Sequence, residues 1–373
     1  MSDFQSLTID GLFTLQSPLH ISDPRRDCRY DAKTHRIVYR QNVGFPLTRT
    51  RTMSFFMPGL SADDDQGRSG VLTVPVLPAA GLRGRLRRAG AKELEDVVVG
   101  EHGEQLSMQA YQGLHCGAIS GNPRGDPPKL DQVRALLDHV FIGLYGGGAR
   151  LTPSRLEVAT GVPLIHELME LDVIPPEYAS QAIVASDAWR LTTVLPIVRN
   201  DDLLSLRDLR AEGVIADFAT VMEEQFVAET ARRKQRVKGT EDAGQEAEAA
   251  TARGLRAMSA VEAVLPGVSF YVCFHLSRGT FAQGGLLIAS LLQLLRQSSG
   301  GLGGKQAVGF GKFTHRLRIT VDGQRGEPFS GRGAGTQINV DMPLICQMTD
   351  AADAALMAIR AQPLHQLIMG EAS

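Results

Sequence analysis

The spacing of apolar residues along the chain predicts both strands and helices. Two segments have the two-residue alternation of half-buried strands: "FQSLTIDGLFTLQSPLHIS" near the start and "GVSFYVCFHLS" from Gly267. A short strand that ends near Pro78 is followed by a helix from about Ala79, because Leu82, Leu86 and Leu94 can share one face. Helical spacing recurs in "GGLLIASLLQLLRQ", and "KFTHRLRITV" after it alternates like a strand.

Further elements are predicted between and after these segments. "DQVRALLDHVFIGLYGGG" is expected to form one amphipathic helix and "SRLEVATGVPLI" a strand. Helices are expected near Leu203–Glu212 and Ala216–Arg233, followed by a mobile loop in "RRKQRVKGTEDAGQEAEAATARG". Near the end, "TQINVDMPLICQM" is expected to form a strand, with a short helix from about Asp350.

With two insertions removed, the order is strand, helix, strand, strand, helix, strand. This order predicts an α+β fold with an RRM-like or ferredoxin-like core. The core is expected to comprise residues 1–22, 71–174 and 261–335, and the insertions residues 23–70 and 175–260. Residues 336–373 are expected to form a C-terminal extension. The fold class by itself licenses no function.

Composition narrows the class of protein only slightly. The 373 residues are 43% hydrophobic and 21% charged, with a net charge of −2, so the chain as a whole is not strongly basic. The four cysteines lie far apart without a C-x-x-C pair, which argues against a zinc site or a disulfide framework. No signal peptide is evident, and the longest apolar stretch is shorter than the roughly 20 residues of a membrane span. We therefore expect a reduced, soluble, cytoplasmic protein without a metal, a cofactor or a membrane partner.

A glycine-rich stretch, "SSGGLGGKQAVGFGKF", raises the question of an anion site. It does not fit a phosphate-binding P-loop, because Ser299 and Gln306 fall where the motif needs a glycine and a hydroxyl. No register fits G-x-G-x-x-G either. Glycines still allow main-chain N–H groups to approach a phosphate closely, and lysines would add charge. The candidate contacts here are Gly301, Gly303, Gly304, Lys305, Gln306, Gly309 and Lys312; the alternative is an ordinary flexible turn.

Arginines form the second candidate for an anionic ligand. "GLRGRLRRAG" places four of them on the first helix with no acidic residue before Glu93: Arg83, Arg85, Arg87 and Arg88. Arg83 and Arg87 are expected to line one side of that helix. Basic residues beside Tyr30, Phe55 and Phe56 suit single-stranded RNA, where bases stack on rings; these are Arg25, Arg26, Arg49 and Arg51. A solvated basic face is the alternative for the helix, and core or subunit contacts for the two phenylalanines.

Four segments in this order resemble the RAMP superfamily of CRISPR proteins. They are "GLFTLQSPLHIS", "VPVLPAAGLRGRLRRA", "FIGLYGGGARLTPSRLEV", and the late strand "MSAVEAVLPGVSFYVCFHL" with its glycine-rich loop "GGLGGKQAVGFGKF". The matching pieces are spread over about residues 5–321, with unmatched insertions between them. The chain is most similar to the Cas seven-like backbone subunit, and within it to the type IV version, called Csf-two.

The resemblance implies a function. It implies a palm formed by the core, a finger at 23–70, a thumb at 175–260, and copies that polymerise head to tail along a CRISPR RNA. The expected partners are CRISPR RNA, further copies of the chain and other subunits of the effector ribonucleoprotein, with a target nucleic acid left open. His20, at the end of the first strand, is a further candidate RNA contact. The basic run of the thumb adds candidate contacts at Arg233, Lys234 and Arg236.

Cleavage is a separate question. Some type III relatives cleave target RNA with an aspartate in the loop after the first strand, and Asp23, Asp27 and Asp31 lie in that region. The match to the type III pattern is poor, and Arg25, Arg26 and Arg29 could simply pair with these acids. We therefore expect a non-catalytic RNA-binding backbone subunit. Two alternatives remain: a type III-like subunit that cleaves target RNA, and a CRISPR RNA-processing endonuclease of the same superfamily.

Overall fold

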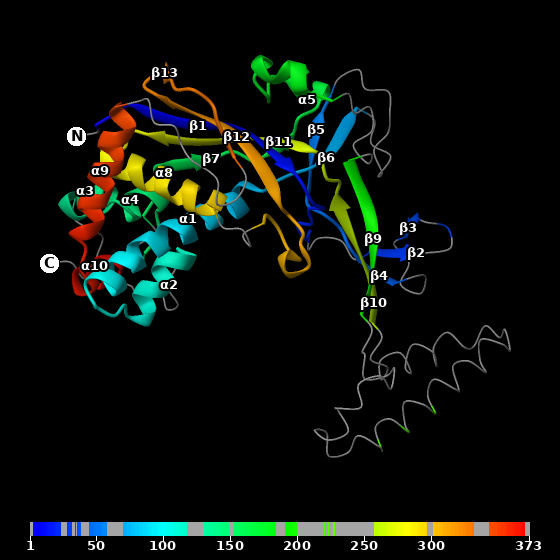
Figure 1. Ribbon diagram of the computed structural model, residues 1–373, viewed down its shortest axis with the longest axis horizontal. Coiled ribbons are helices and arrows are strands. Elements are labelled where there is room, and N and C mark those ends of the chain that lie inside the picture. Colours follow the sequence, from blue (N-terminus) through cyan, green and yellow to red (C-terminus); the bar gives the residue numbers. More distant parts are fainter. Residues whose placement is uncertain are drawn as a thin grey trace. The chain divides into compact units, whose positions relative to one another are not determined.

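Helices and mainly antiparallel sheets make up the computed structural model, which confirms the expected α+β class (Figure 1). The structure describes residues 3–23, 28–31, 34, 36–38, 45–57, 70–117, 130–148, 152–183, 191–199, 220, 223, 227, 257–296, 301–331 and 343–369. The chain divides into two compact units. The first comprises Met1–Ser22, Thr50–Thr193 and Ala263–Ser373, and the second comprises Asp23–Arg49 and Val194–Glu262.

The first strand, β1 (Ser6–Leu15), lies in the middle of the main sheet of the first unit. It pairs antiparallel with β11 (Ser269–Ser277) on one side and with β12 (Phe313–Val321) on the other. Beyond β11 follow β7 (Leu156–Val158) and β8 (Val162–Pro163). Beyond β12 follow β13 (Gln324–Arg325) and β14 (Phe329–Gly331).

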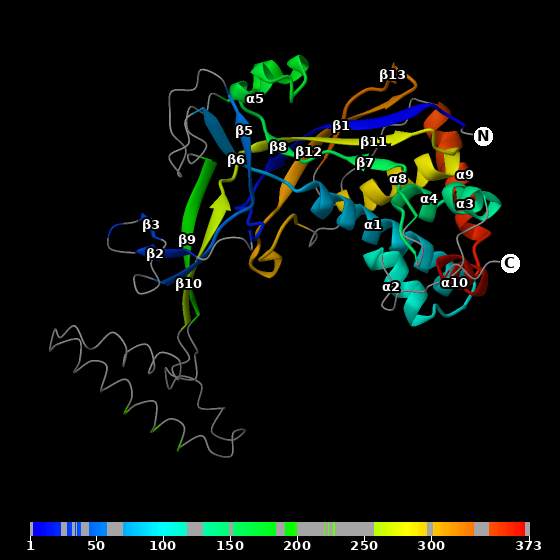
Figure 2. The same ribbon diagram turned by 180° about the vertical axis from the view of Figure 1, so that it is seen from behind.

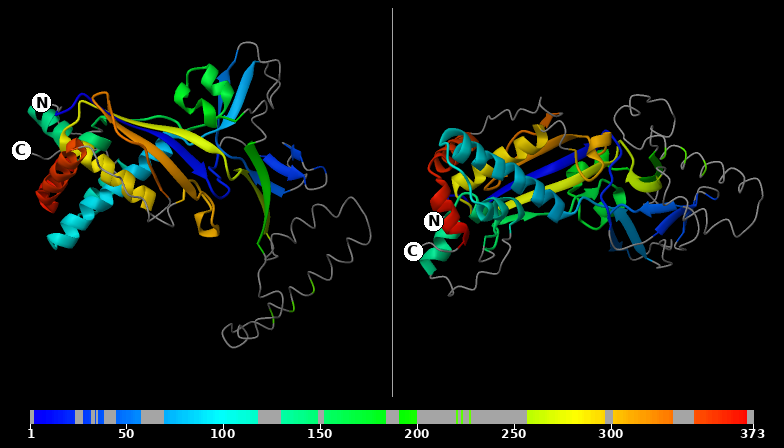
Figure 3. Two further views of the ribbon diagram at one scale, coloured as in Figure 1. Left: turned by 45° about the horizontal axis from the view of Figure 1, so that its top comes forward. Right: turned by 90° about the horizontal axis from the view of Figure 1, so that it is seen from below.

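Two helices connect these strands and cover one face of the sheet. Helix α1 (Ala79–Glu95) lies between β1 and β7 in the sequence, and α8 (Phe281–Arg296) lies between β11 and β12. Both lie over the strands in the right-hand view of Figure 3. The alternation in β1 and β11 follows from this arrangement, since Leu7, Ile9 and Phe270 are among the side chains buried beneath the helices. The topology is therefore the ferredoxin-like one that the order of elements predicted.

The remaining elements of the first unit surround this core. A separate two-stranded hairpin is formed by β5 (Thr52–Phe56) and β6 (Val71–Pro75). The other helices and turns are η1 (Asp96–Glu101), α2 (Met108–Cys116), α3 (Leu130–Asp138), α4 (Ile142–Tyr145), α5 (His166–Glu170), η2 (Pro176–Gln181), η6 (Gln306–Val308), α9 (Pro343–Met357) and α10 (Ala361–Met369). No helix in the described part of the chain is both long enough and apolar enough to span a membrane.

The second unit contains most of a five-stranded sheet. Its order is β3 (Arg36–Val38), β2 (Cys28–Asp31), β4 (Phe45–Thr48), β10 (Ala257–Val264) and β9 (Thr192–Arg199). A small apolar cluster of Cys28, Leu47 and Ala260 supports it, and β10 runs parallel to β4. The expected helices at 203–212 and 216–233, and the loop after them, lie almost entirely outside the described residues.

Several elements differ from the predicted ones. The expected single helix over "DQVRALLDHVFIGLYGGG" is divided into α3 and α4, because the His139 ring accepts hydrogen bonds from the amides of Phe141 and Ile142. The expected strand over "SRLEVATGVPLI" is two short strands, β7 and β8. Pro343–Met348, expected as part of a strand, begins the helix α9.

Helix α9, in the expected C-terminal extension of residues 336–373, belongs to the first unit. It buries Ile345, Met348, Ala352 and Leu356, which recur at helical spacing. The helices α8 and α9 meet at Gly285, where a Cβ atom would lie 2.0 Å from the carbonyl oxygen of Met348. The absence of a side chain at this position therefore lets the two helices pack closely.

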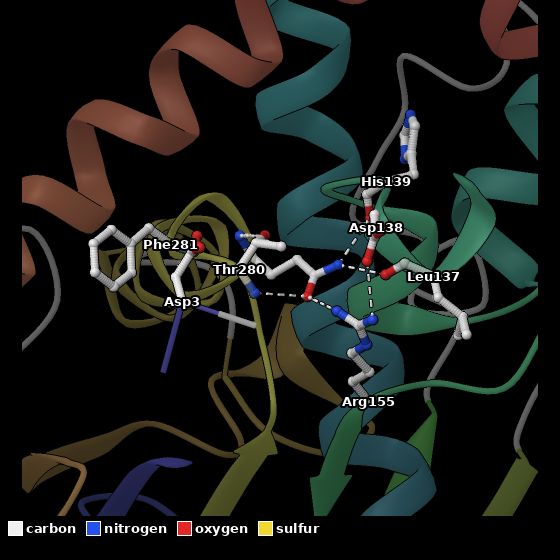
Figure 4. Close-up of polar contacts among 8 residues, drawn as sticks. Asp3, Leu137, Asp138, His139, Arg155, Thr280 and Phe281 are labelled. Atoms are coloured by element: carbon white, nitrogen blue, oxygen red, sulfur yellow. Dashed lines mark hydrogen bonds and ion pairs between the residues drawn. The ribbon is translucent and has the colours of Figure 1, made fainter. Parts of the chain in front are cut away.

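A buried amide side chain joins α8 to the turn between α3 and α4 (Figure 4). The Gln283 side chain is fully buried and donates to the carbonyls of Leu137 (2.7 Å) and His139 (3.2 Å). Its carbonyl oxygen accepts from Arg155 (3.1 Å) and from the amide of Thr280 (3.2 Å). Arg155 also pairs with Asp138 at 3.0 Å. One side chain thus satisfies polar groups from three separate segments.

We predict that Gln283→Ala lowers the free energy of unfolding by about 3 kcal/mol, because buried carbonyls and the Arg155 guanidinium lose their partner. Chemical denaturation followed by circular dichroism measures this change. Gln109→Ala, at an exposed position of α2, is the matched control and should change stability by less than about 0.5 kcal/mol. Equal effects of the two substitutions would contradict the role assigned to Gln283.

Candidate nucleic-acid interface

The glycine loop, residues 301–312, connects α8 to β12 and has a defined backbone. Four of its residues have left-handed torsions: Gly303 (φ 73°), Lys305 (φ 61°), Gly309 (φ 86°) and Gly311 (φ 78°). Three are glycines, which adopt this conformation without steric cost, whereas Lys305 is held there by its surroundings. The loop is therefore an ordered turn in a conformation that its sequence permits.

The base of the loop is fixed to the segment that follows β1. The amide of Gly304 donates to the carbonyl of His20 (2.8 Å), and that of Gly311 donates to the carbonyl of Pro18 (2.8 Å). A Cβ atom at Gly303 would lie 2.3 Å from the His20 carbonyl oxygen, and one at Gly311 would lie 1.9 Å from the Leu302 carbonyl oxygen. These glycines are therefore required where two parts of the protein's own backbone approach each other.

The structure changes the interpretation of Gly301 and Gln306, which were both predicted to contact RNA. Gly301 is buried, and a Cβ atom there would lie 2.6 Å from the Phe310 carbonyl oxygen, so its small size serves internal packing. Gln306, predicted as a contact to RNA, donates its side-chain amide to the carbonyls of Gly301 (2.5 Å) and Gly303 (2.8 Å). Only Gly309, among the glycines predicted as contacts, has open space around its Cβ position. Gln306 thus holds the loop together.

The two lysines of the loop remain at the surface. Lys305 and Lys312 are both exposed, and neither side chain pairs with any residue that the structure describes. Between them the tip of the loop exposes Val308, whose side chain is 68% accessible. His20, by contrast, is 2% exposed, and its ring contacts the Ser22 hydroxyl at 3.1 Å. The loop therefore presents cations, and His20 belongs to the support beneath it.

The arginines of α1 have different environments. Arg87 is 8% exposed and donates to four main-chain carbonyls: those of Gly113 (2.7 Å), Leu114, Tyr145 (3.1 Å) and Gly146 (3.0 Å). These carbonyls lie at the C-terminal ends of α2 and α4, where helices leave acceptors without partners. Burial, and secondarily the neighbouring Arg83, lowers the pKa of Arg87 to about 10, so it stays charged at neutral pH. Arg87, predicted as an RNA contact, is thus directed into the protein in this structure, where four of its five N–H donors are used.

Its neighbours on α1 are more accessible. Arg83 also reaches the Tyr145 carbonyl (2.8 Å), which confirms that it shares a side of the helix with Arg87. Arg85 is half-buried, and burial, followed by repulsion from Arg88, lowers its pKa. Arg88 is exposed, and it pairs with no acidic residue in the described part of the chain. Of the four arginines, Arg88 is therefore the most available to an external anion. The helices α1, α2 and α4 are seen together in Figure 2.

The basic residues of the two insertions are only partly described. Arg49 forms a two-point ion pair with Glu262 in the second unit, at 3.0 and 3.1 Å, with both side chains largely buried. Arg51 belongs to the first unit and is half-buried, and its main chain pairs with Ile21 and Val76. The other predicted contacts lie outside the described residues: Arg25, Arg26, Arg233, Lys234 and Arg236.

The candidate catalytic acids do not form a cluster in the described residues. Asp23 is 5% exposed, and Asp31 accepts a hydrogen bond from the Thr34 hydroxyl at 2.7 Å, as a turn residue does. Asp27 lies outside the described residues. Within the described part of the chain, no group of three or more His, Cys, Asp or Glu side chains could hold a metal ion.

The sequence reasoning missed one set of cations. On β12, Arg316 and Arg318 point away from α1 and α8, because the alternate residues Leu317 and Ile319 are buried beneath the helices. The alternation in "KFTHRLRITV" already contained this signal. These arginines lie on the same strand that leaves the glycine loop.

We predict that Arg87→Met destabilises the protein by about 3 kcal/mol, because four buried carbonyls each lose a donor, although Tyr145 keeps Arg83 and Gly113 keeps the Gly117 amide. Arg88→Met, at the next position, removes the same charge from an exposed site and should change stability by less than about 0.5 kcal/mol. Thermal and chemical denaturation of the two variants compare these values directly. Equal unfolding midpoints would show that Arg87 does not support the fold in this way.

Comparison with known proteins gives a likeness to solved structures only at the level of the fold. No protein-family model matches the chain, and no curated protein matches it. Among solved structures, the chain is similar to one titled "Type IV-B CRISPR Complex", with 16% sequence identity and a TM-score of 0.45. The match covers 91% of this chain and 96% of that chain.

Proposed function

We propose that this chain is a non-catalytic backbone subunit that binds CRISPR RNA and polymerises along it in a type IV CRISPR ribonucleoprotein. The proposal rests on the sequence segments that resemble the RAMP superfamily and on the surface chemistry of one of them. The partners are CRISPR RNA, further copies of the chain and other subunits of the complex. We place this assembly in the cytoplasm.

The observation that carries the proposal is the form of the glycine loop. Its base is fixed by hydrogen bonds to Pro18 and His20 and by the Gln306 side chain, while Lys305 and Lys312 extend from it at the surface. A fixed loop that presents cations loses little conformational entropy when it binds an anion. Phosphates are the anions that RNA offers at every nucleotide, so such a loop suits binding without regard to sequence.

The open face of the main sheet favours the same mode of binding. RRM domains stack RNA bases on exposed aromatic side chains of the central strands. Here the aromatic residue on that face of β11 is Tyr271, and Tyr178 of η2 covers it with ring centroids 5.4 Å apart. Tyr178 in turn donates to Asp10 at 3.0 Å. A base would have to displace η2 to stack there, which favours contacts to the sugar–phosphate chain instead.

The two described candidate aspartates, Asp23 and Asp31, favour a non-catalytic function. A hydrolytic acid needs access to the RNA and, in metal-dependent cleavage, to an ion. Asp23 is almost fully buried and Asp31 is engaged by Thr34, so neither is presented as such a ligand. Cleavage of target RNA by the assembled complex, lost on an aspartate-to-alanine change, would favour the type III-like alternative. A monomer that trims one repeat hairpin would favour the processing endonuclease.

We predict that the chain, co-expressed with a defined CRISPR RNA, purifies as multimers whose length follows the length of the RNA. Their 260/280 nm absorbance ratio should be elevated because RNA is retained. Mass measurement and electron microscopy of complexes on RNAs of different lengths test this. A clean monomer without nucleic acid, even when RNA is supplied, would contradict the proposed function.

A charge-reversal pair identifies the interface. Lys305→Glu with Lys312→Glu should weaken RNA binding by about tenfold or more at moderate salt, for all sequences alike, because phosphate contacts are lost. Arg134→Glu is the control, since this exposed arginine lies on α3 and makes only a 3.5 Å pair with Asp131. Binding unchanged by the lysine pair would remove the glycine loop from the interface.

A further inference from the structure

Cations continue from the glycine loop along the open face of β12. Alternate residues of a strand point to the same side, so Arg316 and Arg318 share one face. In the register of the sheet, Arg316 lies beside Leu12 and Arg318 beside Asp10 of β1. Lys312 directly precedes the strand, and four residues of extended chain to Arg316 span about 13 Å. The exposed lysine and the two arginines thus follow one strand.

The two arginines on this face differ in whether an acidic side chain pairs with them. Both oxygens of Glu177, from η2, accept from Arg318 at 3.2 and 3.1 Å, and one also pairs with Arg325 of β13 at 3.1 Å. Arg316 is exposed and pairs with no acidic side chain among the described residues. One guanidinium is therefore available, while its neighbour is already occupied by a carboxylate.

These side chains surround a hollow. Arg316, Arg318, Glu177, Tyr178 and Gln181 line it, and its volume is roughly 70 Å³. A cavity of this size holds several water molecules, or one tetrahedral anion in their place. Arginine recognises phosphate with paired N–H donors, and Gln181, which also lines the hollow, carries an amide with further donors. The hollow therefore has the size and the donors for a phosphate group, but it also contains a competing carboxylate.

We propose that this hollow is a second phosphate subsite, in which Arg316 binds a phosphodiester of the RNA that the glycine loop holds. The inference rests on the proposed function, because it extends the RNA path from that loop onto the sheet. Glu177 limits the subsite. It neutralises Arg318 and Arg325 and repels the incoming phosphate, so it sets how tightly the RNA is held there.

Two substitutions should act in opposite directions. Arg316→Ala should weaken binding of a fluorescein-labelled, single-stranded 30-nucleotide RNA by about three- to tenfold and reduce its salt slope by about 0.7, the value for one phosphate contact. Glu177→Gln should tighten binding by about two- to fivefold, because Arg318 and Arg325 lose their internal anion. Fluorescence anisotropy between 50 and about 300 mM salt measures both effects.

Arg134→Ala is the control, because it removes another exposed arginine, on α3. The melting temperature of each variant shows whether the fold is retained. Should Glu177→Gln lower the melting temperature, Arg318→Gln with Glu177→Gln removes both members of the Glu177–Arg318 pair and leaves Arg325 without its carboxylate. This double variant should then bind RNA no more weakly than the wild type, and weaker binding would overturn the competing role of Glu177.

The outcomes distinguish a failure of the proposed function from a failure of the second phosphate subsite. Lack of RNA binding by the wild-type chain would refute the proposed function. Binding that depends on Lys305 and Lys312 but is as insensitive to Arg316→Ala as to Arg134→Ala would overturn the subsite alone. Weaker binding by a correctly folded Glu177→Gln variant would overturn the competing role of Glu177.

Discussion

Buried main-chain carbonyls need donors, and Arg87, Gln283 and Gln306 are among the side chains that supply them at turns. Arg87 serves the ends of α2 and α4, Gln283 serves the turn between α3 and α4, and Gln306 serves the glycine loop. A buried acceptor without a partner destabilises the folded state by more than an average hydrogen bond stabilises it, so the fold requires these donors to stay in place. The positions of the helices over the sheet and of the loop beside it depend on them.

This requirement also decides which polar groups remain for a ligand. Arg87 has the donors that a phosphate would need, but four of its five N–H groups donate to carbonyls inside the protein. Arg88, Lys305, Lys312 and Arg316 carry charge at the surface instead, without an acidic partner in the described part of the chain. The interface that we propose is therefore made of cations that the fold does not need, supported from beneath by polar side chains that it does need.

The sequence predicted the central strands and the two covering helices well, since their burial is one-sided and repeats with the period of each element. It did not predict the division between α3 and α4, because a His139 contact to two amides causes it. Arg87 and Arg88 looked alike in "LRGRLRRAG", but they lie on different faces of the helix. Arg87 lies seven residues before the buried Leu94 and one after the buried Leu86, so it falls inside the apolar arc.

The sequence predicted where the candidate site lies better than it predicted what the individual residues of the site do. The glycine loop was identified, but its glycines were interpreted as openings for a ligand, whereas Gly303 and Gly311 allow the chain to pack against itself. Sequence alone cannot distinguish these uses, because both require a missing Cβ atom. The strand residues Arg316 and Arg318 could have been assigned to the open face by alternation, yet their relation to Glu177 is a long-range contact that no local pattern contains.

The overall charge bears on how such a subunit would hold RNA. With a net charge of −2, the chain has no general attraction for a polyanion, so affinity has to come from a few local contacts. Each phosphate contact at a surface contributes modestly and weakens with salt. If copies line one RNA, however, the binding of neighbours adds to each contact through effective concentration. A weak interface in the single subunit, restrained further by Glu177, would then favour RNA occupied by a continuous row of copies over scattered single subunits.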